Sequence, residues 1–210
     1  NKKKNEKGKH FSYFYNSKMH LAEITSAHFN LNLNFKDFKN EIYFSEKEIE
    51  MFRQKIKLPH EFALIQSTSK QTFTKNKEWK VEGMQSIVKF FQKIHWIQIG
   101  KKEEPILKDC EKMPDLNFRE LAYVISKCKF LVSYEGLFNH LASCFDKKNF
   151  LIHTGFLSVE FSHYKNNIVV ENNKNIKCFP CYDFYCSSHK RSLNNNLTNE
   201  YVINIIQKNL

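Results

Sequence analysis

Hydrophobic and polar positions along the chain follow two different periods. Short apolar runs, typical of buried strands, lie at 62–66, 96–99, 130–133, 150–153 and 168–170. Between and after them, apolar residues recur three and four positions apart, which predicts helices at 81–93, 118–127, 137–145 and 199–208. Strands that alternate with helices of this length predict a parallel sheet covered on both faces. We therefore expect an α/β fold with a Rossmann-like parallel sheet.

The first part of the chain has a different character. An amphipathic helix is predicted over 17–29 and a charged helix over 45–55, which Ser45 and Glu48 open as a capping box. We expect residues 1–58 to form a basic N-terminal segment with helices, which would be the end of a partial or missing N-terminal domain. Residues 59–210 are expected to form the Rossmann-like domain. The chain begins with Asn1 rather than Met, so we expect that either the true start is missing or an upstream portion was removed.

The loops that follow the predicted strands hold the candidate chemistry. In a parallel sheet these loops meet at one edge, where ligands collect. The clearest candidate is Glu135-Gly136, which stands between the strand at 130–133 and a helix. Unpaired N–H groups and the dipole at a helix N-terminus suit a phosphate or diphosphate, and an acidic side chain on the same turn suits a hydroxyl. A glycine at a strand-to-helix turn also has a purely steric explanation.

Composition adds a partner class. Hydrophobic residues make up 41% of the chain and aromatic residues 15%, which indicates a packed core rather than disorder. The formal net charge of +11 favours anionic partners such as nucleotides, anionic lipid headgroups or nucleic acid. The lysines are spread along the chain rather than gathered in a stripe, so nucleic acid is not the partner we expect, and an AT-rich genome would also produce this composition. No apolar run approaches the roughly 20 residues of a membrane span, and no signal peptide is visible.

The order of several short motifs resembles a known family. Asn76-Lys77-Glu78-Trp79, Trp96 to Gly100, Asp115-Leu116 with Phe118 to Ala122, and Glu135-Gly136 through His140-Leu141-Ala142 follow one another as in the heptosyltransferase-type glycosyltransferases. The resemblance covers about residues 62–210, with weaker similarity over 20–48. It implies that residues 59–210 bind a nucleotide sugar, as the C-terminal, donor-binding domain of a glycosyltransferase whose two Rossmann-like domains face each other across a cleft (the GT-B architecture).

The resemblance also implies roles for particular residues. Lys77, two positions before a tryptophan, would bind the donor's phosphates, and the loop before it would supply hydroxyl groups. The acidic-glycine turn and the following histidine would lie against the nucleotide sugar. Here Glu stands directly before Gly136 and His140 four residues after it, a less common form of the motif, which leaves the donor sugar open. With Gly100 at the neighbouring strand end, the candidate donor-binding residues are Ser67, Thr68, Ser69, Lys77, Gly100, Glu135, Gly136 and His140.

The resemblance divides the chemistry between two domains. In the family that the chain resembles, the catalytic base is an acidic residue near the start of the N-terminal domain, and no residue of this sequence matches it. Sugar transfer needs the charge of the leaving diphosphate to be stabilised, which a helix N-terminus and a lysine can do without a metal cofactor. For Lys77 a solvated lysine beside a core tryptophan is the alternative, and for His140 a core histidine bonded to a backbone carbonyl.

A second cluster of candidate ligands lies near the C-terminus. Cys178, Cys181, Cys186 and His189 have the spacing of a compact tetrahedral zinc site. The aromatic residues around them favour a packing role instead, and a disulfide is a third possibility that a reducing cytoplasm would oppose. A structural zinc ion is therefore one of three interpretations. Cys128 and Cys144 are expected to be small core residues.

Three functions follow from these patterns. The leading expectation is a cytoplasmic glycosyltransferase chain that binds a nucleotide-diphosphate sugar and serves a glycan or lipid-linked acceptor, with peripheral contact to an anionic membrane. The second is a nucleotide- or sugar-binding module without catalysis, motivated by the missing base. The third is a zinc-dependent nucleic-acid-binding protein built on the C-terminal cysteines.

Overall fold

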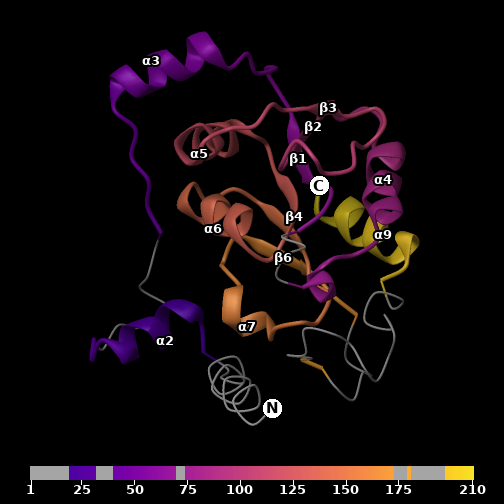
Figure 1. Ribbon diagram of the computed structural model, residues 1–210. Helices are drawn as coiled ribbons and strands as arrows, with labels where there is room; N and C mark the ends of the chain where they lie inside the picture. The colour runs from indigo at the N-terminus through magenta and orange to yellow at the C-terminus, as the bar shows by residue number, and fades with distance from the viewer. Residues whose placement is uncertain (1–18, 32–39, 70–73, 173–178, 181–196) are drawn as a thin grey trace.

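A six-stranded parallel sheet organises the chain. The computed structural model describes residues 19–31, 40–69, 74–172, 179–180 and 197–210. Its strands are paired in the order β3-β2-β1-β4-β5-β6, and every pairing is parallel (Figure 1). The strands are β1 Ala63–Gln66, β2 Trp96–Ile99, β3 Glu111–Lys112, β4 Leu131–Tyr134, β5 Asn149–Ile152 and β6 Asn167–Val170. This confirms the expected α/β class.

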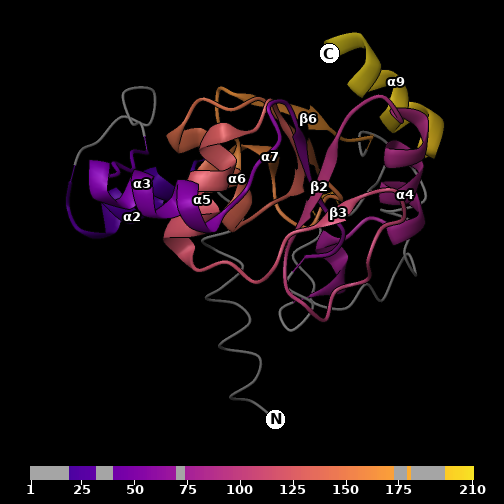
Figure 2. The same ribbon diagram turned by 90° about the horizontal axis from the view of Figure 1, so that it is seen from above.

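Helices cover both faces of the sheet. Figure 2 shows α4 and α9 on one side of the strands and α5 and α6 on the other, with α3 outside α5. The helices are α2 Leu21–His28, α3 Glu46–Lys55, α4 Val81–Phe90, α5 Phe118–Lys127, α6 Leu137–Cys144, α7 Val159–Ser162 and α9 Asn199–Asn209, with a 3-10 turn η2 at Lys75–Lys77.

Alternate residues of a strand point to the two faces of the sheet and pack in two separate hydrophobic cores. Ile65 faces the core that α4 and α9 close, whereas its neighbour Leu64 faces the core that α5, α6 and α3 close. Both side chains are fully buried, which is why the strands read as continuous apolar runs rather than as alternating ones. Phe52 of α3 lies in the second core beside Tyr123 of α5, with ring centroids 5.1 Å apart, so α3 packs on the Rossmann-like sheet.

Side-chain caps fix the starts of several helices, including α2, capped by His20, and α9, capped by Thr198. Ser45 caps α3 and Asn117 caps α5, and in both cases a glutamate three residues on bonds back to the cap's backbone N–H. The box at Ser45 and Glu48 was predicted from the sequence and is confirmed. Such a cap satisfies backbone donors that the first turn leaves without helical partners.

The structure corrects the predicted elements in several places. The helix expected over 17–29 begins only at Leu21, because His20 caps it. The helix expected over 81–93 ends at Phe90, because Phe91 leaves the helical conformation and its carbonyl accepts a hydrogen bond from the Trp96 indole at 3.2 Å. The two-residue strand β3 and the one-turn helix α7 were not predicted, since both are too short to show a period.

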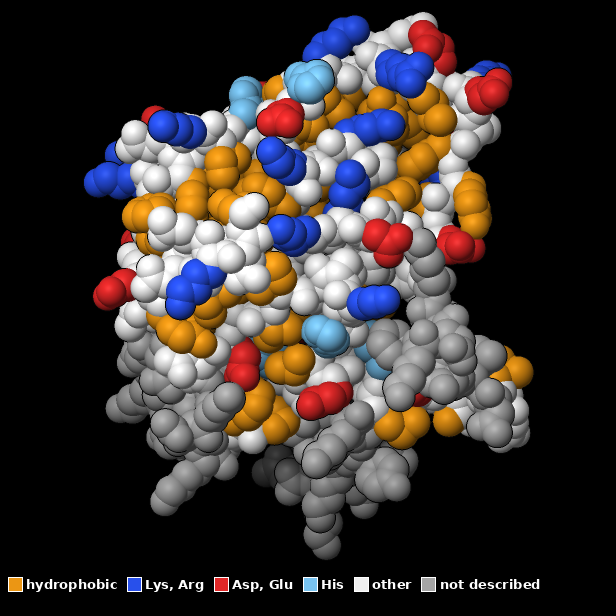
Figure 3. Space-filling view, turned by 180° about the vertical axis from the view of Figure 1, so that it is seen from behind, with side chains coloured by type: hydrophobic (Ala, Val, Ile, Leu, Met, Phe, Trp, Pro, Cys, Tyr) orange, Lys and Arg blue, Asp and Glu red, His pale blue; other side chains and the backbone are white. Residues whose placement is uncertain are grey.

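The surface carries its charge in a dispersed form. On the face shown in Figure 3, Lys and Arg side chains are interspersed with hydrophobic and uncharged ones. Among the described residues, none of the helices is both long and apolar enough to cross a bilayer.

Candidate functional site

The strand order reverses between β1 and β4, and the carboxyl ends of these two strands form the candidate site. From β1 the sheet continues through β2 to β3 on one side, and from β4 through β5 to β6 on the other. Gln66 links the two ends: its Oε1 accepts the Tyr134 N–H at 3.1 Å, while its Nε2 donates to the Thr68 carbonyl at 2.7 Å. In open parallel sheets such a reversal is where ligands bind, because the two loops leave in opposite directions.

The turn after β4 leads into α6 through Gly136. Gly136 has φ 136° and ψ −151°, a conformation essentially restricted to glycine, and a Cβ added there would meet no heavy atom within 4 Å. Gly136 is the N-cap residue of α6, and among the described residues no side chain caps this helix. The first turn of the helix therefore directs its backbone N–H groups and the positive end of its dipole to an open position, which suits an anion.

Three charged side chains meet beside this turn. The Glu135 side chain is 4% exposed; its Oε1 lies 2.7 Å from Nε2 of His153 and its Oε2 lies 3.5 Å from Nζ of Lys77. Lys77 comes from η2, is 18% exposed, and also lies over the Phe156 ring, 5.5 Å from its centroid. Lys77 is thus a half-enclosed cation at the site rather than a solvated lysine.

The charged groups of this cluster shift one another's pKa values. Burial by itself would raise the pKa of Glu135, but His153 and Lys77 outweigh it and hold that pKa below its ordinary value. Burial by itself would lower the pKa of His153, but Glu135 outweighs it, with Glu171 and the Ser158 backbone adding to the effect, so the pKa of His153 is raised. The two groups therefore favour an imidazolium–carboxylate pair.

His140 belongs to the same region but bonds to a phenol. Its Nδ1 lies 2.7 Å from Oη of Tyr164, not against a backbone carbonyl. Burial and then the charge of Lys77 lower the pKa of His140. The His20 ring, just before α2, also contacts the Tyr164 ring, with centroids 4.9 Å apart. Burial followed by the charge of His140 lowers the pKa of His20 to about 4. Neutral histidines thus flank Tyr164.

The hydroxyl residues after β1 are buried at the same edge. Ser67 accepts a hydrogen bond from Nε2 of Gln98 at 2.8 Å, and the Ser69 N–H donates to Glu78 at 2.7 Å. Ser69 is 8% exposed, and its hydroxyl has no hydrogen-bond partner among the described residues.

Gly100, the remaining predicted residue, has a local steric role. Its φ is 137°, and a Cβ there would collide with the Glu104 carboxylate, which accepts the Lys101 N–H at 3.0 Å. Gly100 therefore packs against Glu104 and not against Lys77 or Glu135. Glu104 in turn lies 3.4 Å from the Ser67 hydroxyl. The structure brings together Lys77, Glu135, Gly136 and His140, with Ser67 to Ser69 beside them at the next strand end.

His153 and Gln66 were missed as site residues in the sequence. His153 directly follows β5, and the register of β4 with β5 pairs Tyr134 with Ile152, so the next residue of each strand, Glu135 and His153, must lie side by side. The sequence signal for this pair is a glutamate directly after one strand and a histidine directly after the strand that pairs with it.

The cysteine–histidine cluster lies outside the description. Cys178, Cys181, Cys186 and His189 are not among the described residues, so the zinc interpretation stays a prediction. Within the described part of the chain, no three His, Cys, Asp or Glu side chains are grouped as metal ligands. Cys128 is buried and Cys144 is partly buried.

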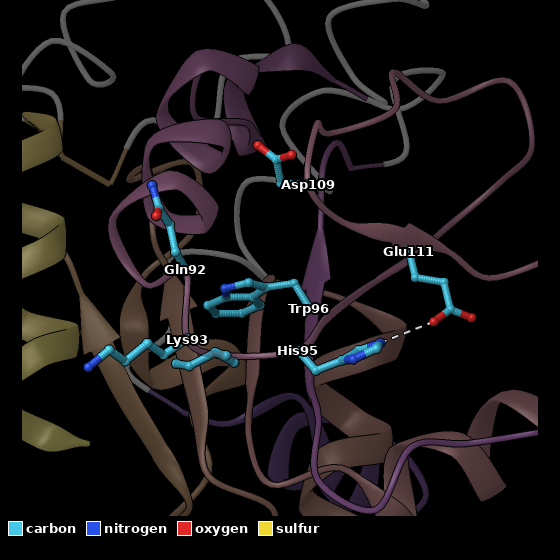
Figure 4. Close-up of a pocket in the computed structure, with 7 residues that line it drawn as sticks. Gln92, Lys93, His95, Trp96, Asp109 and Glu111 are labelled. Atoms are coloured by element: carbon cyan, nitrogen blue, oxygen red, sulfur yellow. Dashed lines mark hydrogen bonds and ion pairs between the residues drawn. The ribbon is translucent and has the colours of Figure 1, made fainter.

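A hollow of about 390 Å³ lies at the opposite ends of the strands from the candidate site, where β2 and β3 begin. Figure 4 shows its lining, in which the His95 ring reaches toward the Glu111 carboxylate at 3.1 Å. Both of these side chains are about half exposed, so this shallow hollow lacks the enclosed charges of the site at β1 and β4.

Comparison with solved structures places the fold. A glycosyl transferase family 9 protein from Veillonella parvula aligns with a TM-score of 0.63 at 15% identity, over 91% of this chain and 60% of that one. The E. coli heptosyltransferase WaaC, solved with ADP, gives 0.59 at 16% identity over 93% and 58%, and E. coli ADP-heptose LPS heptosyltransferase II gives 0.58 at 13% over 80% and 52%.

These likenesses establish a fold shared with part of a GT-B-type glycosyltransferase. The chain spans between about half and three fifths of the length of these structures. No protein-family profile and no curated protein matches the sequence.

Proposed function

We propose that this chain is the donor-binding part of a glycosyltransferase that takes its sugar from a nucleoside diphosphate. The observation that carries the proposal is the uncapped N-terminus of α6, which opens at Gly136 at the strand-order reversal with the Lys77 ammonium beside it. A diphosphate needs backbone N–H donors and a cation, and this edge of the sheet offers both.

The chemistry assigned to these residues is stabilisation of the leaving group. When the bond between the sugar's anomeric carbon and the diphosphate breaks, negative charge grows on the departing phosphate oxygen. The N–H groups of α6 and the ammonium of Lys77 would balance that charge without a metal ion. The acceptor hydroxyl must also lose a proton, and we assign no residue of this chain to that step.

The solved structures support this choice of donor. WaaC was solved with ADP and with a fluorinated ADP-heptose analogue, and TibC with an ADP-heptose. For this chain we propose a nucleotide-diphosphate sugar as donor and a glycan or lipid-linked acceptor, in the cytoplasm. The charge of +11 suits an anionic membrane on which such an acceptor would lie.

Nucleotide binding tests the proposal. Titration calorimetry with ADP, UDP and GDP should detect one site, and the change Lys77→Ala should weaken it by about 1.5–3 kcal/mol, the range for a lost charged hydrogen bond. Lys129→Ala is the matched control, because Lys129 also pairs with a glutamate, at 3.4 Å, but is 65% exposed and precedes β4 at the opposite edge. Equal affinity of the two variants for the nucleotide would overturn the assignment of this site.

Binding and turnover assays on the same protein distinguish a transferase from a binding module. Nucleotide binding together with release of the sugar from a sugar nucleotide supports a transferase. Binding without hydrolysis or transfer by the full-length protein supports a module that has kept the sheet and lost catalysis.

A further inference from the structure

The charges at the candidate site do not by themselves favour an anion. Glu135 carries one negative charge and Lys77 one positive charge, and the two groups are 3.5 Å apart. If these were the only charges, the pair would be neutral and a diphosphate would meet a carboxylate as close as the ammonium. An anion site needs a positive excess.

His153 supplies the missing charge. Its side chain is 0% exposed, and its Nε2 lies 2.7 Å from the Glu135 oxygen that faces away from Lys77. We propose that protonated His153 is a positioning residue for the donor: it neutralises Glu135 and so leaves the charge of Lys77 to the diphosphate. This inference rests on the proposed function.

The proposal requires that the nucleotide affinity follow the protonation of His153. With His153 protonated, the three groups sum to one positive charge, and with His153 neutral they sum to zero. Among the described residues, Glu135 after β4 and Glu171 after β6 are the carboxylates that act on His153, and both favour the protonated ring. His140 faces Lys77 and its pKa is lowered, so its own titration falls at more acidic pH.

Sugar nucleotides are the probes that test this dependence. In ADP-glucose, UDP-glucose and GDP-glucose each phosphate carries one ester and one anhydride bond, so neither has a group that ionises near neutral pH. The charge of the diphosphate is therefore constant over the range used, unlike that of a free nucleoside diphosphate. The tightest of the three is titrated against the protein at about pH 6 and about pH 9, on either side of the histidine range. We expect roughly tenfold weaker binding at the higher pH, the order of effect of one unit charge about 10 Å away in a protein.

Two variants assign the effect to His153. His153→Gln removes the titrating ring, so its affinity should be as weak at about pH 6 as that of the unmodified protein at about pH 9, with no further change on raising the pH. His95→Gln is the matched control, because His95 also pairs with a glutamate, at 3.1 Å, but is half exposed and lies at the opposite edge of the sheet. It should keep both the affinity and the pH profile.

A measurement on the unmodified protein covers the case in which His153→Gln does not fold. Calorimetry in buffers of different ionisation enthalpy counts the protons taken up when the sugar nucleotide binds. Near the pKa of His153 we expect uptake of a fraction of one proton. Zero uptake, a flat pH profile, or an unchanged pH profile in His153→Gln would overturn the role of His153 alone, whereas absence of binding at every pH would overturn the proposed function with it.

Discussion

Nε2 of His153 and Oε1 of Glu135 lie 2.7 Å apart in a part of the protein that water hardly reaches. The two residues are 18 positions apart in the chain, yet the parallel register of β4 and β5 makes them neighbours, because each is the first residue after its strand. An ion pair in such a place contributes only while both partners are present, since either alone would be a buried charge.

Loss of Glu135 should therefore be costly for the fold. In Glu135→Ala the cations of His153 and Lys77 lose their common partner, and we expect the free energy of unfolding to fall by about 3–5 kcal/mol, as for other broken buried pairs. Urea unfolding measures this change. Glu61→Ala breaks the exposed pair with Lys129, so it should change the free energy of unfolding by less than about 1 kcal/mol. Similar losses in the two variants would contradict the burial argument.

Stability should decrease on both sides of neutral pH for different reasons. The pKa of His153 is raised above 6.5, so its contribution to stability is fully present below that value and is lost as the pH rises through the folded pKa. The pKa values of His20, His140 and His163 are lowered, so their contributions are present above 6.5 and are lost as the pH falls. Urea unfolding free energies measured from about pH 5 to about pH 9 should pass through a maximum.

The part of the acidic limb that His20 contributes can be tested separately. His20 caps α2 through its Nδ1, and asparagine is a good cap that does not titrate. His20→Asn should therefore lose less stability than the unmodified protein between about pH 7 and about pH 5. His28→Asn changes an exposed histidine of the same helix and should leave the pH dependence as it is. If both variants kept the original acidic limb, His20 would not be its source.

Gly136 should be needed for both conformation and binding. Alanine at φ 136° would strain the backbone, so Gly136→Ala should lower the free energy of unfolding by about 1–3 kcal/mol and, by filling the position in front of α6, weaken nucleotide binding. Gly83→Ala is the comparison: its Cβ would press on the Trp79 ring, so it should lose about 1–3 kcal/mol through overpacking while its nucleotide affinity stays intact. Calorimetric titration of the two variants distinguishes these results, and intact affinity in Gly136→Ala would contradict a ligand at this turn.

The cap at Ser45 should make a measurable contribution to the attachment of α3. Ser45→Ala removes the acceptor of the Glu48 N–H, and we expect the free energy of unfolding to fall by about 1 kcal/mol. Ser86→Ala, inside α4, is the matched change: that hydroxyl bonds the Gly83 carbonyl in its own helix, and alanine is the better helix former. Equal effects of the two changes on urea unfolding would show that α3 does not depend on its cap.

Much of the fold could be predicted from periodicity. The helix over 118–127 and the strand over 96–99 have the predicted bounds, because their apolar positions keep one period from end to end. Strand β3 has two residues, Glu111 and Lys112, of which Glu111 is exposed, so no apolar pattern marks it. Only the pairing of Ile97 with Glu111 and of Gln98 with Lys112 makes it a strand, and pairing is a tertiary property.

The candidate site was predicted less completely than the fold. Glu135 and Gly136 stand out because an acid and a glycine interrupt an apolar pattern, and Lys77 follows from the resemblance to heptosyltransferases. The binding roles of these residues stay predictions. His153 belongs to an apolar run and so resembles the end of a strand; its importance depends on which strand lies beside β5, and one sequence without pairing information does not reveal that.

Helix α9 completes a core that begins more than a hundred residues earlier. Its Val202 and Ile206 are fully buried in the layer formed with α4, and just before it the Leu197 carbonyl accepts a hydrogen bond from the Trp79 indole at 2.8 Å. During translation the first half of the sheet therefore leaves the ribosome with one of its faces covered by α4 but not yet by α9. The remaining part of that face stays open to chaperones until the polypeptide that contains α9 has emerged, so this layer is completed only after α9 has left the ribosome.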